Sequence, residues 1–241
     1  MRGRVTKSTP LTPPSPLPRG EGVNKFSFVL REIAGRLELS ALHHPGYGAI
    51  CADWATPEVQ RRVAAGRRQL LARAVGLHKM RGLRILDATA GLGRDGYILA
   101  ALGAHLTLVE RHPSIAALLA DAHRRALTNP ATCEAAARLT LAAADSRTLF
   151  EQKWDVIYLD PMYPASGKTA LAKKELQLLR ELTGGDHDAD SLLDAALANA
   201  QQRIVVKRPL KAPPLALRQP SLSLAGSQLR FDIYLTAKRS S

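Results

Sequence analysis

The chain has 241 residues, 46% of them hydrophobic, which suits one globular domain of ordinary size. Lysine and arginine number 34 against 21 acidic residues, and the resulting net charge of +13 favours a polyanionic partner such as nucleic acid. No apolar run is long enough to span a bilayer, and the N-terminus lacks the apolar core of a secretory signal, so neither a membrane protein nor a secreted one is expected.

Residues 1–22 are rich in proline, serine, threonine and glycine, and they predict a disordered tail because they cannot bury enough apolar surface to offset the entropy of ordering. Residues 23–55 show short apolar alternation with breaks at Gly35 and Pro45, which predicts a small N-terminal β region. We expect residues 56–241 to form the main domain.

A helix is predicted to begin at Thr56 and Pro57 and to run towards Gly76, since a threonine cap, a proline in the first turn and a terminal glycine mark helix ends. Arginines recur along it. The residues are Arg61, Arg62, Arg67, Arg68 and Arg73. Both a solvated helix surface and a nucleic-acid-binding face fit this charge pattern.

The rest of the chain alternates between strands and helices. Strands are predicted at 83–87, 105–110, 139–145, 154–160 and 203–209, helices at 94–102, 113–127, 169–182 and 188–201, and a closing hairpin at 221–226 and 229–237. Strands separated by helices indicate βαβ units, and therefore an α/β fold with a mostly parallel sheet. A terminal hairpin that adds an antiparallel strand is typical of a methyltransferase sheet.

Residues 86–97 read "LDATAGLGRDGY", in which Gly91, Gly93 and Gly96 match the nucleotide-binding pattern G-x-G-x-x-G. A strand ends, glycines allow a tight turn, and a helix N-terminus offers free N–H groups to a ligand. The loop fits either a nicotinamide cofactor or the methyl donor S-adenosylmethionine. Glu110 ends the second strand and can bind a ribose in either case.

Other positions favour the methyl donor. Asp87 closes the first strand directly before the glycine loop, near the amino-acid end of such a cofactor. Asp145 and Ser146 end the third strand, where they can accept a hydrogen bond from an adenine amine. A nicotinamide-dependent oxidoreductase needs an acid/base pair for hydride transfer, and no Tyr-x-x-x-Lys or comparable pair follows the fourth strand.

The fourth strand ends in "LDPMYP" (159–164), which resembles the [D/N]-P-P-[Y/F/W] signature of methyltransferases that act on nucleobase amines. An aryl amine is a poor nucleophile because its lone pair is delocalised. A carboxylate at Asp160 would orient the nitrogen and favour the charge that develops on it. Pro161 stiffens the turn, and Tyr163 can stack on the target base. The alternative is an Asp-Pro turn in which Tyr163 only packs.

In combination, "DATAGLGRDGYILA", "VER", "YLDPMYP", "TALAKKELQLLREL", "VVKRP" and "RFDIY" resemble the bacterial small-subunit ribosomal RNA methyltransferase J family. The resemblance covers roughly residues 30–236. It implies a Rossmann-like class I methyltransferase with a mostly parallel seven-stranded sheet, which uses S-adenosylmethionine to methylate the N2 amine of a guanine. Residues 56–241 would then be the methyltransferase domain.

The resemblance also implies the cofactor contacts. They fall on Arg94, Asp95, Glu110, Arg111, Asp145, Ser146 and Asp160. The family shares Met162 after Pro161, which favours guanine over adenine. Asp145 stands where known members have a serine, but an aspartate is common there in related methyltransferases.

Cations that follow the fourth strand, or end the fifth, are expected to hold RNA phosphates around the target base. They are Lys168, Lys173, Lys174, Lys207 and Arg208. The expected partner is small-subunit ribosomal RNA or the 30S particle. We expect the protein itself to be a monomer in the cytoplasm. A non-catalytic RNA-binding assembly factor with the same fold and an adenine-N6 methyltransferase stay open as alternatives.

No metal is expected. The two cysteines, Cys51 and Cys133, match no metal-binding spacing, and the pair His43–His44 has no cysteine or acid nearby to complete a site. The chemistry requires none either, since the sulfonium of the donor is already a strong electrophile.

Overall fold

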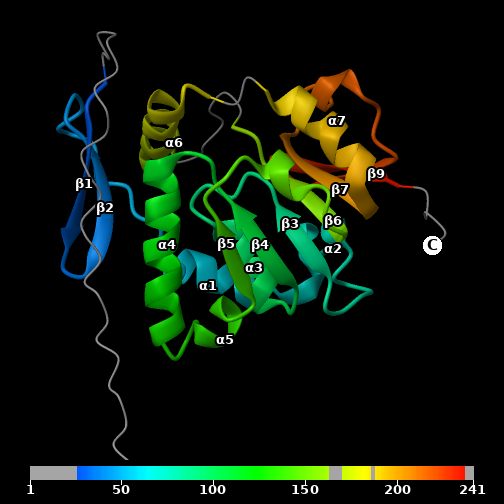
Figure 1. Ribbon diagram of the computed structural model, residues 1–241, viewed down its shortest axis with the longest axis horizontal. Coiled ribbons are helices and arrows are strands. Elements are labelled where there is room, and N and C mark those ends of the chain that lie inside the picture. The colour runs from blue at the N-terminus through cyan, green and yellow to red at the C-terminus, as the bar shows by residue number, and fades with distance from the viewer. Residues whose placement is uncertain (1–25, 163–169, 186–187, 237–241) are drawn as a thin grey trace, which may run out of the picture.

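A computed structural model describes residues 26–162, 170–185 and 188–236, with the side chains of 170–173 left aside. Its centre is a seven-stranded sheet in the order β5-β4-β3-β6-β7-β9-β8 (Figure 1). The strands are β3 (Arg84–Asp87), β4 (His105–Val109), β5 (Leu139–Ala142), β6 (Trp154–Leu159), β7 (Ala200–Pro209), β8 (Leu222–Ala225) and β9 (Leu229–Leu235).

The direction of the strands confirms the predicted methyltransferase-like sheet. Strands β3, β4, β5, β6 and β7 pair in parallel, whereas β9 is antiparallel to both of its neighbours, β7 and β8. The chain leaves β3 towards β4 and β5 on one side and returns to β6 and β7 on the other. Ligands bind at such a switch point, beyond the carboxyl ends of the strands.

Helices cover both faces of the sheet. They are α1 (Pro57–Ala64), α2 (Leu70–Val75), α3 (Arg94–Ala101), α4 (Pro113–Thr128), α5 (Cys133–Ala136), α6 (Ala170–Thr183) and α7 (Ala189–Asn199). One buried cluster joins the sheet to α1–α6, and a second joins its other face to α7. No helix in the described part of the chain is both long and apolar enough to cross a membrane.

The long helix predicted from Thr56 to Gly76 is wrong in one respect, because it is interrupted after Ala64. Gly66 takes a φ of +66° and Gln69 is extended, so a 3-10 turn separates α1 from α2. Thr56 makes no side-chain cap bond. Gly76 ends α2 as predicted, with a left-handed φ of +93°. The short helix α5 was not predicted.

The predicted N-terminal β region is a hairpin of β1 (Phe28–Ile33) and β2 (Arg36–Ala41) that lies beside α4, on the opposite side of the molecule from α7 (Figure 1). The backbone N–H of Leu37 donates to Asp121 Oδ2 of α4 at 3.1 Å. Further along, Trp54 is buried in the main core. The tail predicted at residues 1–22 lies outside the described residues.

Candidate active site

A pocket of about 580 Å³ opens beyond the carboxyl ends of β3, β4, β5 and β6. Its volume lies in the usual range for a small-molecule or cofactor site. The pocket brings together every residue predicted to bind the cofactor, together with Pro161, Met162 and Lys207. The predicted cofactor residues in its wall are Asp87, Gly91, Gly93, Arg94, Asp95, Glu110, Arg111, Asp145, Ser146 and Asp160.

The glycine loop follows β3 and needs glycine for two different reasons. Gly91 has a φ of +54°, and a Cβ there would meet nothing within 4 Å, so the backbone itself faces open space along the pocket. Gly93 has a φ of +72°, and a Cβ there would lie 2.5 Å from Leu119 and 2.9 Å from Trp54. The loop is therefore packed tightly from behind and open to a ligand in front.

Glu110, at the end of β4, holds this loop in place. Its Oε2 accepts the N–H of Gly91 at 3.0 Å, and its Oε1 accepts the N–H of His112 at 2.7 Å. The carboxylate is buried and lines the pocket. It can thus orient the loop and still present acceptor lone pairs to ribose hydroxyls.

We expect Glu110→Gln to weaken S-adenosylhomocysteine binding by about 10–100-fold, since losing a hydrogen bond to a charged group costs about 1.5–3 kcal/mol. Glutamine keeps one acceptor oxygen but turns an NH₂ group towards a backbone donor. Calorimetric titration measures the effect. Glu134→Gln is the matched control, because the side chain of Glu134 is 85% exposed and pairs with Arg138. Unchanged affinity in Glu110→Gln would remove Glu110 from the cofactor site.

A chain of paired charges, centred on the buried Asp95, lines one wall of the pocket. Asp95, in the first turn of α3, accepts from Arg62 at 2.6 Å, from the Tyr158 hydroxyl at 2.8 Å and from Lys207 Nζ at 2.9 Å. Burial alone would raise the pKa of Asp95, but Lys207 and Arg62 outweigh it and hold that pKa well below its ordinary value. Asp95 is therefore an anion at every pH of interest.

Asp160 ends this chain of charges at the pocket. Its Oδ2 accepts from Lys207 Nζ at 2.7 Å, and its backbone N–H donates to Thr89 Oγ1 at 2.6 Å. The side chain is 35% exposed, so the carboxyl group still reaches the pocket. Burial raises the pKa of Asp160 above its ordinary value, although Lys207 opposes the rise. Asp160 is a positioned acceptor at the place where the sequence motif predicts one.

The position of Lys207 corrects the expectation that it holds RNA phosphate. Its ammonium lies between Asp95 and Asp160 and is committed to them. Arg208 differs from expectation too: it is only 4% exposed and donates to the carbonyl oxygen of Pro213. Neighbouring residues of a strand point to opposite faces, so Lys207 and Arg208 cannot both face one ligand.

Arginines and acids pair across the rim of the pocket. Arg94 makes two hydrogen bonds to Glu175 of α6, at 2.7 and 2.9 Å. Arg111 and Arg147 both donate to Asp188, just before α7, and lower its pKa to about 2. These pairs join the loops that carry the predicted cofactor residues to the helices α6 and α7.

The remaining predicted residues are less informative. Met162 lines the pocket. Lys174, on α6, lies over the ring of Tyr47, with its ammonium 4.8 Å from the ring centre. Tyr163 and Lys168 lie outside the described residues, as does the side chain of Lys173.

Sequence reasoning did not single out Thr89, Tyr158 or Glu175, and it left the role of Arg62 open. Tyr158 carried a usable signal, since a hydroxyl inside an otherwise apolar strand needs a buried partner. Thr89 and Glu175 carried none, because their partners come from distant parts of the chain.

Known proteins with similar sequences are methyltransferases, which agrees with a cofactor pocket at this position. A family model described as "Putative SAM-dependent methyltransferase" matches residues 21–236. The ribosomal RNA small subunit methyltransferase J of Colwellia psychrerythraea is 45% identical over 215 residues, which cover 88% of this chain and 79% of the relative. The enzyme of the same name from Pseudomonas aeruginosa is 50% identical over 180 residues, which cover 73% and 69%. The chain belongs to the ribosomal RNA small subunit methyltransferase J family.

Solved structures support the same fold. A SAM-dependent methyltransferase from Neisseria gonorrhoeae superposes with a TM-score of 0.69 at 32% identity, covering 90% of this chain and 86% of that one. The T. thermophilus 16S rRNA N2 methyltransferase, solved with AdoMet and guanosine, superposes at 0.51 with 16% identity, covering 88% of this chain and 51% of that one. Family membership confirms the prediction of S-adenosylmethionine and decides against a nicotinamide cofactor.

Proposed function

We propose that this member of the methyltransferase J family methylates the exocyclic N2 amine of a guanine in small-subunit (16S) ribosomal RNA. The observation that carries the proposal is Asp160, held by Lys207 at the edge of a pocket that fits S-adenosylmethionine and followed by Pro161 and Met162. The relatives are named as methyltransferases of small-subunit ribosomal RNA, and this supports the same RNA as the substrate here. The T. thermophilus enzyme is an example of guanine-N2 methylation on this fold.

The residues present fit the cofactor by their chemistry. Gly91 leaves open space along the pocket, Glu110 offers a carboxylate near the ribose position, and Asp145 lies near the expected adenine. When bound, S-adenosylmethionine supplies an activated methyl group on sulfur. Asp160 accepts a hydrogen bond from the guanine N2 amine and aims the nitrogen lone pair at that methyl group.

The same contacts suggest how the positive charge on N2 is stabilised and where its proton goes. As the new N–C bond forms and the C–S bond breaks, N2 gains positive charge and its remaining N–H becomes acidic. Asp160 stabilises this charge, and its raised pKa makes it a better acceptor for the released proton than a solvated carboxylate. Lys207 holds the carboxyl group in place, and we propose that Tyr163 stacks on the guanine.

The residues proposed to bind RNA are lysines that follow the proposed catalytic segment, residues 159–164, in the sequence. We propose that Lys174, with Lys168 and Lys173, contacts phosphates beside the target guanine, and that the net charge of +13 attracts the RNA over longer distances. The proposed boundaries are an N-terminal β region at 23–55 and a methyltransferase domain at 56–241, which acts as a monomer on the 30S particle or its RNA in the cytoplasm.

The test uses small ribosomal subunits from cells that lack this protein. Incubation with the full chain and radiolabelled S-adenosylmethionine is expected to give N2-methylguanosine, identified by nucleoside mass spectrometry. Label in N6-methyladenosine would replace guanine with adenine as the target. RNA binding without any label, in subunits, their precursors and free RNA, would instead indicate an assembly factor that does not catalyse methyl transfer.

A further inference from the structure

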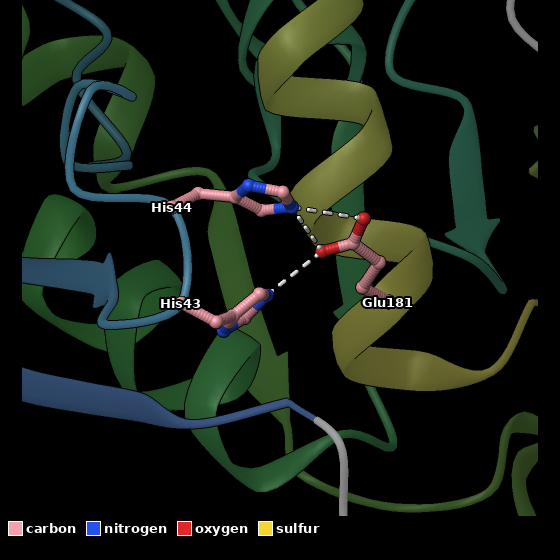
Figure 2. A group of neighbouring side chains, drawn as sticks. All are labelled: His43, His44 and Glu181. Carbon is pink, nitrogen blue, oxygen red and sulfur yellow. Dashed lines mark hydrogen bonds and ion pairs between the residues drawn. The ribbon is translucent and has the colours of Figure 1, made fainter.

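His43, His44 and Glu181 form a cluster that is separate from the active-site pocket (Figure 2). The two histidines lie in the turn that follows β2, and Glu181 lies in the last turn of α6. None of the three lines the pocket. The sequence-based expectation that no acid completes the His43–His44 pair is therefore wrong, because the fold brings Glu181 to it from 137 residues away.

We propose that His43, His44 and Glu181 bind one divalent transition-metal ion of the zinc type. Imidazole nitrogen and carboxylate oxygen are ligands that zinc accepts, and the candidate ligand atoms all lie within 4.8 Å of one another. Figure 2 shows both Nε2 atoms turned towards the same carboxylate. One carboxylate and two neutral imidazoles would leave a fourth position for water.

The separations between His44 and Glu181 fit a tetrahedral ligand set. His44 Nε2 lies 3.4 Å from both oxygens of Glu181, and His43 Nε2 lies 2.9 Å from Oε2. Ligands about 2.0–2.1 Å from a tetrahedral zinc ion are about 3.3 Å from each other. A charge-assisted hydrogen bond would instead be about 2.7–2.9 Å long. The His44 distances are therefore those of ligands that share an ion, whereas the His43 distance is that of a hydrogen bond, which an entering ion would replace.

The surroundings hold each candidate ligand in orientation, as metal sites require. His43 Nδ1 is 3.1 Å from both the N–H and the carbonyl oxygen of Ser27. In the tautomer that donates to the carbonyl oxygen, the Nε2 lone pair is left for the metal. The ring of His44 stacks on Tyr47, with ring centres 4.5 Å apart. Gln177 donates to Glu181 Oε1 at 2.8 Å.

The three side chains are partly exposed, so an ion can reach them from solvent. The side chains of His43, His44 and Glu181 are 17%, 30% and 15% exposed. A bound ion would fasten the turn after β2 to α6, the helix that follows the catalytic segment. Its role would be structural, since the cluster is apart from the methyl-transfer pocket.

The test is zinc titration of the full chain, purified without an affinity tag and stripped with a chelator. We expect one Zn²⁺ per chain with micromolar or tighter affinity, measured against a chromophoric competitor. Binding should raise the Tm by about 5 °C at saturating metal. The double variant Cys51→Ser/Cys133→Ser should bind zinc as the wild type does, which excludes a thiol site.

Variants locate the site. Glu181→Gln keeps the shape of the side chain and should weaken zinc binding at least 10-fold, and His43→Ala should do the same. His78→Ala is the matched control, because His78 is an exposed histidine elsewhere on the surface and should change nothing. Circular dichroism of Glu181→Gln verifies folding. Substoichiometric binding to the wild type, or full binding to folded Glu181→Gln, would overturn the proposal.

Discussion

Asp160→Ala is expected to lower kcat for methylation of the small subunit by about 10²–10³-fold. In the proposed mechanism, the carboxylate is the acceptor that orients the lone pair of the guanine amine and stabilises its developing charge, and the variant lacks it. The fold should survive, because Lys207 keeps its bond to Asp95 at 2.9 Å and the backbone bond from residue 160 to Thr89 does not need the side chain. Single-turnover methyl transfer to subunits measures the loss.

Cofactor affinity separates this effect from a collapsed pocket. S-adenosylhomocysteine binding in Asp160→Ala should stay within about 10-fold of wild type, because the contacts proposed for Glu110 and the glycine loop do not need the Asp160 side chain. Asp194→Ala is the control, since Asp194 is 56% exposed and pairs with Arg218 away from the pocket. Retention of a third or more of the activity in Asp160→Ala would contradict the proposed role of this carboxylate.

Lys207→Met is expected to lower both stability and activity. Methionine fills a similar volume but leaves Asp95 and Asp160 without the ammonium that both contact, at 2.9 and 2.7 Å. Removing one partner of a buried ion pair costs about 3–5 kcal/mol, and we expect the lower end because the Lys207 side chain is 25% exposed. A loss of about 3 kcal/mol corresponds to a Tm lower by about 6–12 °C in a chain of this size. Thermal unfolding followed by circular dichroism measures the change.

The pH dependence of this variant has a defined sign. The pKa of Lys207 is raised by Asp160 and Asp95, so its contribution to wild-type stability is complete below the ordinary value of 10.5. The pKa of Asp95 is lowered, so its contribution is complete above 3.8 and is lost as the pH falls further. In Lys207→Met both carboxyl groups protonate more easily. The Tm difference from wild type should therefore be smaller at acidic than at neutral pH. A difference that does not change with pH would argue against coupled charges.

Much of the fold could be predicted because its strands are buried apolar runs that end at chemically distinctive residues. Strand β6 is an example, since its apolar run stops before Asp160 and the strand ends at Leu159. Local signals also placed the glycine loop. They failed at Gly66, where one left-handed glycine divides a sequence whose composition is otherwise helical.

The site was predictable as a set of positions but not as a network of contacts. The carboxyl ends of parallel strands share one edge, which placed Asp87, Glu110, Asp145 and Asp160 together. Which residue pairs with a given charge depends on long-range contacts that no local pattern encodes, such as that of Lys207 with Asp95, which are 112 positions apart. Alternation along β7 did carry a usable signal, because it allows only one of Lys207 and Arg208 to face the pocket.

Trp54 connects the region before α1 to the glycine loop: its Nε1 donates to the carbonyl oxygen of Leu92 at 3.0 Å, and its ring stacks on Tyr97 of α3. A ligand that orders this loop must therefore also favour the bound arrangement of Trp54, and by thermodynamic reciprocity a well-packed Trp54 favours the ligand. Amide hydrogens in the segment around Trp54 should then exchange more slowly when the cofactor is present. The N-terminal region is in this sense part of the cofactor's binding equilibrium, although it contributes little of the pocket wall.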